Sequence, residues 1–244
     1  FYLPAAKPET LLNLVDREAH HAANVLRIRK GETVTVLNGA GAEYICEVQD
    51  VSKKNVSLTV RERKQTPPLP YQVTLLQAIP KGKLIESIIQ KATELGISRI
   101  VPLVTERVIT NVGDERAEEK REKWQQVAVE AIKQCGQPWL PKVETPVSPK
   151  EFLRRNEQFD LPLIASLHGG SQHPRYLFSN YRESHKVNPK TVSLWVGPEG
   201  DFTPAEVEQI IAAGVSPITL GPLVLRCETA AIYCLSFVNY ELQS

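Results

Sequence analysis

Paired cysteines and long apolar runs are both missing from this sequence of 244 residues. The four cysteines are scattered, with no CxxC pair and no histidine at metal-ligand spacing: Cys46, Cys135, Cys227 and Cys234. We therefore expect neither a zinc or other metal site nor a disulfide framework. The cysteines are expected to be small buried hydrophobic residues.

A membrane helix and an excess of positive charge are missing as well. No segment has the roughly 18 consecutive apolar residues that a membrane helix needs. The first residues, FYLPAAKPET, lack the order of a signal peptide, so a cytoplasmic protein is expected. The formal net charge is only +1, so any surface that binds phosphate must come from local clusters of lysine and arginine.

A change in residue composition and hydrophobic pattern near residue 68 predicts two domains. Residues 33–63 contain short stretches rich in valine, threonine and isoleucine, separated by turn residues, which predicts a small antiparallel β-barrel. A short helical pattern, EAHHAANVLRIRKGE, precedes these stretches. The stretch KQTPPLP at 64–70 is typical of a stiff linker. We therefore expect one domain at 1–68 and a second at 71–244.

Apolar strands alternate with helices after the linker, which predicts an α/β domain with a parallel sheet covered on both faces. The expected strands are 73–79, 99–104, 161–167, 192–196 and 217–220. Two amphipathic helices are expected, at 83–96 and from about 115 to 136. The longer helix carries an apolar stripe from Trp124 to Cys135, and its charged first half is expected to be a solvated face.

The segment LWVGPEGDFTPAEVEQIIAAG, residues 194–214, joins a buried strand to a helix. Its loop, Gly197-Pro198-Glu199-Gly200, lets a ligand approach the backbone closely. Thr203 and Glu206 have the spacing of a capping box at the helix start. Such a turn holds anionic or polar ligands on backbone N–H groups, although a purely structural turn uses the same residues. The segment is neither a Walker loop nor a GxGxxG motif.

A second turn of this kind, Gly221-Pro222, lies in ITLGPLVLRCETAAIYCLSF, residues 218–237. Two glycine-proline turns at the carboxyl ends of neighbouring strands would line one crevice, where open α/β sheets bind ligands. Arg226 and Glu228 lie among apolar residues near the start of the last helix. They are expected either to face this crevice or to form an ion pair that caps the helix.

Segments along nearly the whole chain together resemble one family. They are HHAANVLRIRKGE, QAIPKGKLIESIIQKATELGISRIVPLVTER, EKWQQVAVEAIKQCGQ, VGPEGDFTPAEV and LGPLVLRCETAA. The chain resembles the RsmE family, SPOUT-class methyltransferases that act on N3 of a uridine in the 16S RNA of the small ribosomal subunit. The resemblance implies an N-terminal PUA-like RNA-binding barrel, an α/β domain with a trefoil knot, S-adenosylmethionine (SAM) as cofactor, and a homodimer.

The resemblance also implies a set of site residues, because in such domains the loops of the knot hold the cofactor. Carried onto this sequence, the cofactor residues are Leu194, Val196, Gly197, Pro198, Glu199, Gly200, Leu220, Gly221, Leu225, Arg226 and Cys227. Apolar walls and backbone N–H donors suit the adenine and the carboxylate of SAM. Arg226 is the expected catalytic cation, with Glu199 and Glu228 as catalytic bases or as organisers of the arginine.

RNA binding is expected from two basic clusters, Arg27, Arg29 and Lys30 in the first domain and Lys81 and Lys83 at the start of the second. A merely solvated basic loop is the alternative for each of these residues.

The sequence departs from the family's pattern at four positions. A glycine is common where Asp201 stands, a threonine where Cys227 stands, and an arginine where Leu223 and Gln137 stand. An aspartate is tolerable at a helix start, where a carboxylate is favoured. The missing arginines remove two cations that could contact RNA phosphate.

Three other functions share parts of this pattern. Another SPOUT methyltransferase, acting on a ribose 2′-hydroxyl or on a transfer RNA base, would use the same cofactor pocket, so the product distinguishes it. A non-catalytic RNA-binding factor of ribosome assembly would keep the barrel but would have an inactive cofactor pocket. Measured binding of SAM distinguishes an enzyme from such a factor. A flavodoxin-like nucleotide-binding protein is disfavoured because no phosphate-binding loop follows the first strand.

Overall fold

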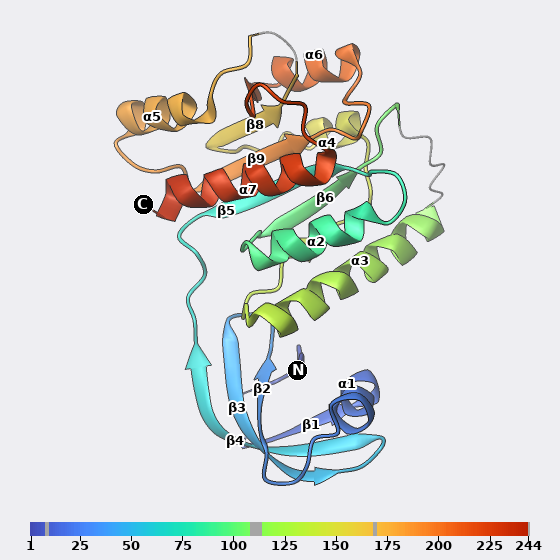
Figure 1. The fold of residues 1–244 in the computed structure, drawn as a ribbon. Helices are drawn as coiled ribbons and strands as arrows, with labels where there is room; N and C mark the ends of the chain where they lie inside the picture. Colours follow the sequence, from blue (N-terminus) through green and yellow to red (C-terminus); the bar gives the residue numbers. More distant parts are fainter. Residues whose placement is uncertain (8–9, 108–113, 168–169, 244) are drawn as a thin grey trace. The chain divides into compact units, whose positions relative to one another are not determined.

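The computed structural model describes residues 1–7, 10–107, 114–167 and 170–243 (Figure 1). Their contacts group the chain into two compact units. The N-terminal unit comprises Phe1–Pro68 together with Ile132–Leu140, and the sheet unit comprises Leu69–Ala131 together with Pro141–Ser244. The chain therefore enters the sheet unit, contributes a later segment to the N-terminal unit, and then completes the sheet unit.

A four-stranded antiparallel sheet, in the order β1-β4-β3-β2, forms the N-terminal unit. Its strands are β1 (Leu11–Val15), β2 (Thr33–Leu37), β3 (Ala42–Val51) and β4 (Asn55–Gln65). Side chains of β3 alternate between buried and partly buried positions, so one face packs on a core that includes Tyr44, Cys46 and Leu58. The strands predicted at 33–63 are confirmed, and β1 adds an edge strand to them.

A short helical segment follows β1, as the sequence predicts. It consists of α1 (Asp16–His20) and the π-helix η1 (His21–Leu26), which ends where Arg27 adopts a left-handed backbone with φ 54°. Ile28 packs against the core of the unit, and the backbone N–H of Gly31 donates to a carbonyl oxygen of β3 at 2.8 Å. Arg27, just before these anchors, and Arg29 and Lys30, between them, are exposed.

The segment Ile132–Leu140 is bound to the N-terminal strands by backbone contacts. The N–H of Gly41 donates to the carbonyl of Pro138 at 2.9 Å, and the indole N–H of Trp139 donates to the carbonyl of Thr66 at 3.0 Å. Gly41 has φ 88°, and a Cβ there would lie 2.6 Å from the Trp139 ring. Only glycine fits this close approach.

Six parallel strands form the sheet unit, in the order β10-β8-β9-β5-β6-β7. They are β5 (Gln72–Ala78), β6 (Arg99–Leu103), β7 (Lys142–Val143), β8 (Leu161–Ala165), β9 (Thr191–Val196) and β10 (Ser216–Ile218). The five strands predicted from the sequence are confirmed. The short edge strand β7 is an addition, since two residues give no readable pattern.

Helices cover both faces of this sheet. They are α2 (Leu84–Glu94), α3 (Asp114–Cys135), α4 (Pro149–Arg154), α5 (Pro174–His185), α6 (Pro204–Ala212) and α7 (Cys227–Gln243). Phe152 of α4 and Ile210 of α6 share a core with Trp195 of β9, whereas α7 packs against α2 and β9 (Figure 1). Within the described part of the chain, every helix is too short or too polar to cross a membrane.

One expectation about the cysteines is wrong. Cys46, Cys227 and Cys234 are buried as predicted, but Cys135 is exposed. The apolar stripe of α3 is buried at Trp124 and Ile132, and its buried part ends at Ile132. Cys135 therefore has the spacing of a buried position, but its side chain is exposed.

The parallel strands place five loops at one edge of the sheet. The loops after β5, β6, β8, β9 and β10 all leave the carboxyl ends of their strands, where open α/β sheets bind ligands. Because β9 lies between β8 and β5, the loop that follows it, residues 197–203, has neighbouring loops on both sides. We call this segment the central loop.

The start of α6 fixes the far end of the central loop, and the predicted capping box is present. The Thr203 N–H donates to Glu206 Oε2 at 2.8 Å, and the Glu206 N–H donates to Thr203 Oγ1 at 3.3 Å. Glu206 is buried and also accepts the Glu106 N–H, which follows β6, at 3.0 Å. One carboxylate therefore caps the helix and joins the central loop to a neighbouring loop.

Replacing Glu206→Ala is expected to lower the free energy of unfolding by about 1–3 kcal/mol, because two backbone N–H groups lose their acceptor. Urea denaturation measures this difference. Glu208→Ala is the matched control, because Glu208 lies in the same helix and is exposed. Equal stability of the two variants would contradict the assignment.

Candidate functional site

A cavity of about 780 Å³ opens at the carboxyl edge of the sheet. Its described lining is Ala165, Ser166, Leu167, Gly170 and Ser171 after β8, Val196 to Asp201 after β9, and Thr219 to Cys227 with Ala230 after β10. We call it the first cavity. Both glycine-proline turns line it, as the sequence predicts, and its volume lies within the range of about 300–1,000 Å³ found for ligand pockets.

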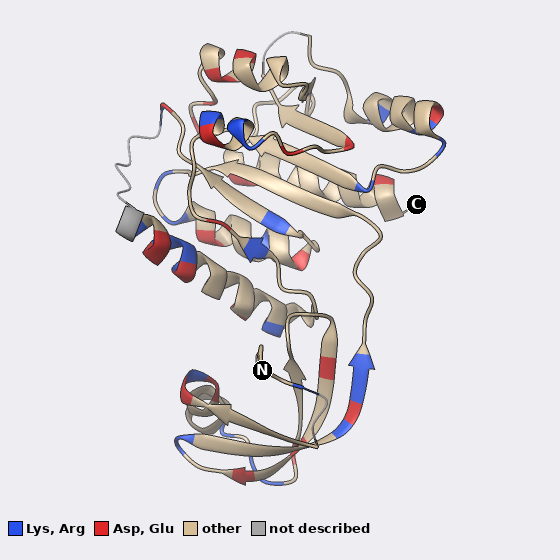
Figure 2. Ribbon diagram, turned by 180° about the vertical axis from the view of Figure 1, so that it is seen from behind, with Lys and Arg blue, Asp and Glu red and all other residues tan. Residues whose placement is uncertain are grey.

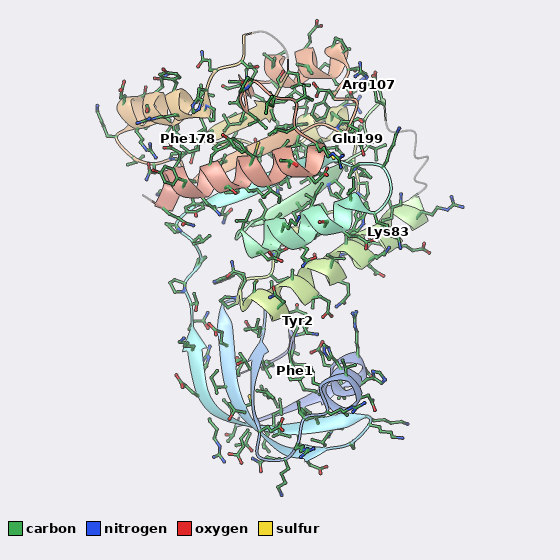
Figure 3. The ribbon with its side chains drawn as sticks, viewed as in Figure 1. Phe1, Tyr2, Lys83, Arg107, Phe178 and Glu199 are labelled. Carbon is green, nitrogen blue, oxygen red and sulfur yellow. The ribbon has the colours of Figure 1, made fainter. Side chains whose placement is uncertain are left out.

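The central loop is tied to its neighbours on the β5 and β6 side. The backbone N–H of Lys81 donates to Glu199 Oε1 at 3.0 Å, and the Arg107 guanidinium donates to the carbonyl oxygen of Gly200. Figure 3 shows Arg107 and Glu199 at the same edge of the sheet as Lys83. Phe202 then anchors the loop in the apolar core. The wall of the first cavity is thus held from behind by two other loops.

Gly197 and Asp201 make a turn that admits no further side chain. A Cβ at Gly197 would lie 2.7 Å from Asp201 Oδ1 and 3.2 Å from the Phe202 nitrogen. Asp201 Oδ1 accepts the Phe202 N–H at 2.8 Å, so it cannot move away without losing that bond. Asp201 itself has φ 61°, a conformation that favours glycine and that aspartate tolerates. This explains why a glycine is common at position 201 in the family resembled.

The loop after β10 supplies the opposite wall. Gly221 has φ 107°, and a Cβ there would meet no atom within 4 Å, so the backbone conformation and not crowding calls for glycine. Its N–H donates to Thr219 Oγ1 at 3.2 Å. Leu223 and Val224 follow with 73% and 77% of their surface exposed. The cavity mouth is therefore apolar where the family often has an arginine.

Arg226, Cys227 and Glu228 lie at the start of α7. Arg226 is exposed, and its side chain makes no ion pair with the residues that the structure describes, so the helix-capping pair with Glu228 is not formed. Burial, followed by the nearby Glu228 and Glu199 carboxylates, raises the pKa of Cys227 to about 12. The thiol is therefore neutral at physiological pH and is not a nucleophile.

Most of the cofactor residues predicted from the sequence line the first cavity. They are Val196, Gly197, Pro198, Glu199, Gly200, Leu220, Gly221, Leu225, Arg226 and Cys227. Leu194 does not line it, because its side chain is buried inside β9. Glu228 is also outside the described lining, although its carboxylate lies 3.5 Å from Cys227 Sγ.

Sequence reasoning missed the loop after β8. Ser166, Gly170 and Ser171 line the first cavity, and Gly169-Gly170 after an apolar strand is the signal that could have found them. His168 and Gly169 lie outside the described residues.

Lys81 and Lys83 line a second cavity, of about 690 Å³, on the other side of the central loop. Pro198, Glu199 and Gly200 line both cavities. Across the described residues, no cluster of three or more His, Cys, Asp or Glu side chains could hold a metal ion. The two cavities present backbone amides, the guanidiniums of Arg107 and Arg226, carboxylates and lysines.

Two family models match the chain. The RNA methyltransferase domain model matches residues 67–239, and the RNA methyltransferase PUA domain model matches residues 14–61. Ribosomal RNA small subunit methyltransferase E of Bacillus subtilis is 36% identical over 234 residues, which cover 95% of this chain and 90% of that protein. The chain belongs to the ribosomal RNA small subunit methyltransferase E (RsmE) family.

Solved relatives of this RsmE family member have the same fold and contain SAM. The enzyme from Neisseria gonorrhoeae bound to SAM is 27% identical, with a TM-score of 0.84 over 98% of this chain and 96% of that one. A putative methyltransferase from Legionella pneumophila in complex with SAM is 34% identical, with a TM-score of 0.87 over the same shares. The predicted fold class, an α/β methyltransferase domain with a parallel sheet preceded by a PUA domain, is confirmed.

Proposed function

We propose that this RsmE family member methylates N3 of a uridine in the 16S ribosomal RNA of the small subunit, with SAM as methyl donor. The observation that carries the proposal is the single cavity in which the two glycine-proline turns meet. Relatives named as small subunit methyltransferases supply the class of RNA. The N3 position and the uridine come from the family resemblance.

The first cavity fits SAM in size and in chemistry. Gly197, Gly200 and Gly221 expose backbone along its walls, which suits a ligand whose carboxylate and adenine bind N–H donors. Leu220 and Leu225 supply apolar surface. Glu199 adds a carboxylate to the lining, which favours a ligand with a positive charge. When bound, SAM supplies an electrophilic methyl group on its sulfonium.

The protein's own task is to position the uracil and to favour loss of its N3 proton. Forming the N–C bond at N3 replaces the N–H bond, so negative charge develops on the uracil oxygens as that proton leaves. An exposed guanidinium at the mouth of the cofactor cavity stabilises such charge. We therefore assign this role to Arg226, which lines the first cavity.

Glu199 and Glu228 are the candidate proton acceptors or organisers of Arg226. Both carboxylates help to raise the pKa of the Cys227 thiol, so both lie near the start of α7. Glu199 is already bonded to the Lys81 N–H, which makes it the more fixed of the two. We propose Glu199 as a positioning carboxylate and Glu228 as the group with freedom to receive a proton.

RNA binding is proposed for both domains, 1–68 as the RNA-binding domain and 71–244 as the catalytic domain. The proposed contacts are Arg27, Arg29, Lys30, Lys81 and Lys83. Support comes from the exposed, anchored loop that carries the first three and from the second cavity that the last two line. Contacts between these cations and phosphates would make binding weaker as salt increases.

A homodimer and a cytoplasmic location complete the proposal. Val224, Tyr233 and Tyr240 are large side chains with 77%, 49% and 77% of their surface exposed, and they lie on α7 or in the loop before it. Apolar surface of this kind is typical of a protein interface. Sedimentation at the mass of one 27.3 kDa chain would contradict the dimer. The cytoplasm is proposed because small ribosomal subunits are assembled there.

Replacing Gly197→Ala is expected to weaken SAM binding by at least about tenfold, because the added methyl group displaces the turn at Asp201 and Phe202. Isothermal titration calorimetry measures the dissociation constant. Glu208→Ala is the control, because Glu208 is exposed on α6, the helix that follows the same loop, and lies outside the described lining. Unchanged affinity in Gly197→Ala would show that the central loop does not hold the cofactor.

Mass spectrometry of 16S RNA from cells with and without this protein tests the proposed reaction. We expect N3-methyluridine in the first RNA and unmodified uridine in the second. Small subunits from the deficient cells are then the substrate in vitro. Arg226→Ala is expected to lower turnover by about 100- to 1,000-fold, with SAM affinity retained.

The alternatives give different products in the same experiment. A ribose 2′-O-methyl group or a methylated transfer RNA base would assign the chain to another SPOUT activity. No change in any RNA, with SAM unbound, would indicate a non-catalytic assembly factor. Normal turnover of a folded Arg226→Ala protein would remove Arg226 from the chemistry.

A further inference from the structure

The second cavity lies at the carboxyl edge of the sheet, beside the first. Its described lining is Ile79 to Lys83, Ile85, Glu86, Arg107, Lys120, Lys123, Trp124 and Pro198 to Gly200. These residues come from the loop after β5, α2, the segment after β6, α3 and the central loop. All of them belong to the sheet unit, and no part of the cofactor assignment uses this cavity apart from its shared wall.

Positive charge dominates this lining. Its charged side chains are the cations Lys81, Lys83, Arg107, Lys120 and Lys123 and the anions Glu86 and Glu199. Figure 2 shows lysine and arginine both in the loop before α2 and along the first half of α3. The sequence pattern favoured a solvated face for that half of α3, whereas the structure turns two of its lysines toward a cavity.

The two anions of the lining are already engaged. Glu86 pairs with Lys123 at 2.6 Å, and Glu199 accepts the Lys81 N–H at 3.0 Å. Arg107 donates to the Gly200 carbonyl. Lys83 and Lys120, by contrast, make no side-chain hydrogen bond or ion pair with the described residues. The five cations of the lining outnumber its two carboxylates, so the hollow that Lys83 and Lys120 share keeps an excess of positive charge.

We propose that the second cavity binds a phosphate group of the RNA backbone next to the target nucleotide, through Lys83 and Lys120. This inference rests on the proposed function. An anion is the ligand that the unneutralised charge favours, and lysine is a common phosphate-binding residue in proteins. Because Pro198 to Gly200 also line the cofactor cavity, a phosphate held here lies one loop away from the methyl donor. The site would fix the register of the RNA strand.

Arg107 connects the second cavity to the central loop. Its guanidinium both lines the second cavity and holds the Gly200 carbonyl. An RNA phosphate in this cavity would therefore lie beside the cation that positions the cofactor wall. For this reason Arg107 is unsuitable as a test variant, since its loss would also disturb the first cavity.

Binding of labelled 16S RNA, measured from low to high salt, tests the proposal with Lys83→Ala and Lys120→Ala. Each variant is expected to lower the slope of log K against log salt by about 0.7–0.9, which changes the affinity ratio between 50 and 200 mM salt by about threefold. Lys83 makes no side-chain cap bond, so its loss does not weaken the helix start. Lys150→Ala is the control, because Lys150 is exposed on α4 and outside this cavity.

Kinetics on small subunits supply the second measurement. Loss of a contact that is made equally in the bound state and in the transition state raises KM for RNA and leaves kcat and KM for SAM unchanged. Salt slopes of Lys83→Ala and Lys120→Ala equal to that of Lys150→Ala would overturn the proposal. Inorganic phosphate is expected to compete with RNA more strongly than chloride of equal ionic strength. Competition that is just as strong in Lys83→Ala and Lys120→Ala would also overturn the proposal.

The proposed phosphate site and the proposed reaction can be rejected independently of each other. If the wild-type protein modifies no RNA, the proposed function fails, and the slopes still report whether the second cavity contacts phosphate. If the wild-type protein modifies RNA while the slopes of the variants are unchanged, only the phosphate site is wrong.

Discussion

The tethering of the central loop is the constraint on which both cavities depend. The loop follows β9, which has β8 on one side and β5 on the other, and its residues Pro198 to Gly200 line a cavity in each direction. The Lys81 N–H, the Arg107 guanidinium and the Glu106 N–H fix it from two neighbouring loops. Hydrogen bonds to charged groups contribute about 1.5–3 kcal/mol each, and they offset part of the entropy that is lost when the loop is ordered.

This arrangement links local sequence to chemistry. Gly197 is required because its missing Cβ leaves room for the Asp201 turn, and that turn delivers Phe202 to the core and Thr203 to the start of α6. Gly197 and Gly200 then expose backbone along the first cavity, beside Pro198 and Glu199. A cavity lined by backbone groups, an exposed Arg226 and a cationic hollow behind the same loop together fit the site that we propose for RNA methylation.

The sequence was sufficient for the features that local patterns encode. Hydrophobic periodicity predicts the parallel strands and the long helices, and the capping box at Thr203 and Glu206 follows from spacing alone. Two glycine-proline turns predict one crevice because parallel strands end at one edge. The trefoil knot follows only from the family resemblance, since the threading of a chain leaves no periodic signal.

The features that the sequence did not reveal depend on the order of strands and on three-dimensional charge placement. The loop after β8 lines the first cavity because β8 lies between β10 and β9, an order that no pattern in the chain encodes. Lys120 has the periodicity of a solvated face, yet it shares a cavity with Lys83. Leu194 is part of the motif but lies inside β9, where its side chain supports the sheet and not the cavity.

Amide hydrogen exchange with and without SAM tests the central claim most directly. The account predicts that SAM slows exchange in two separate segments, residues 197–200 and 220–227, and leaves the N-terminal strands unchanged. Protection confined to one of these segments, or located away from the carboxyl edge of the sheet, would contradict a single cavity built by the two turns.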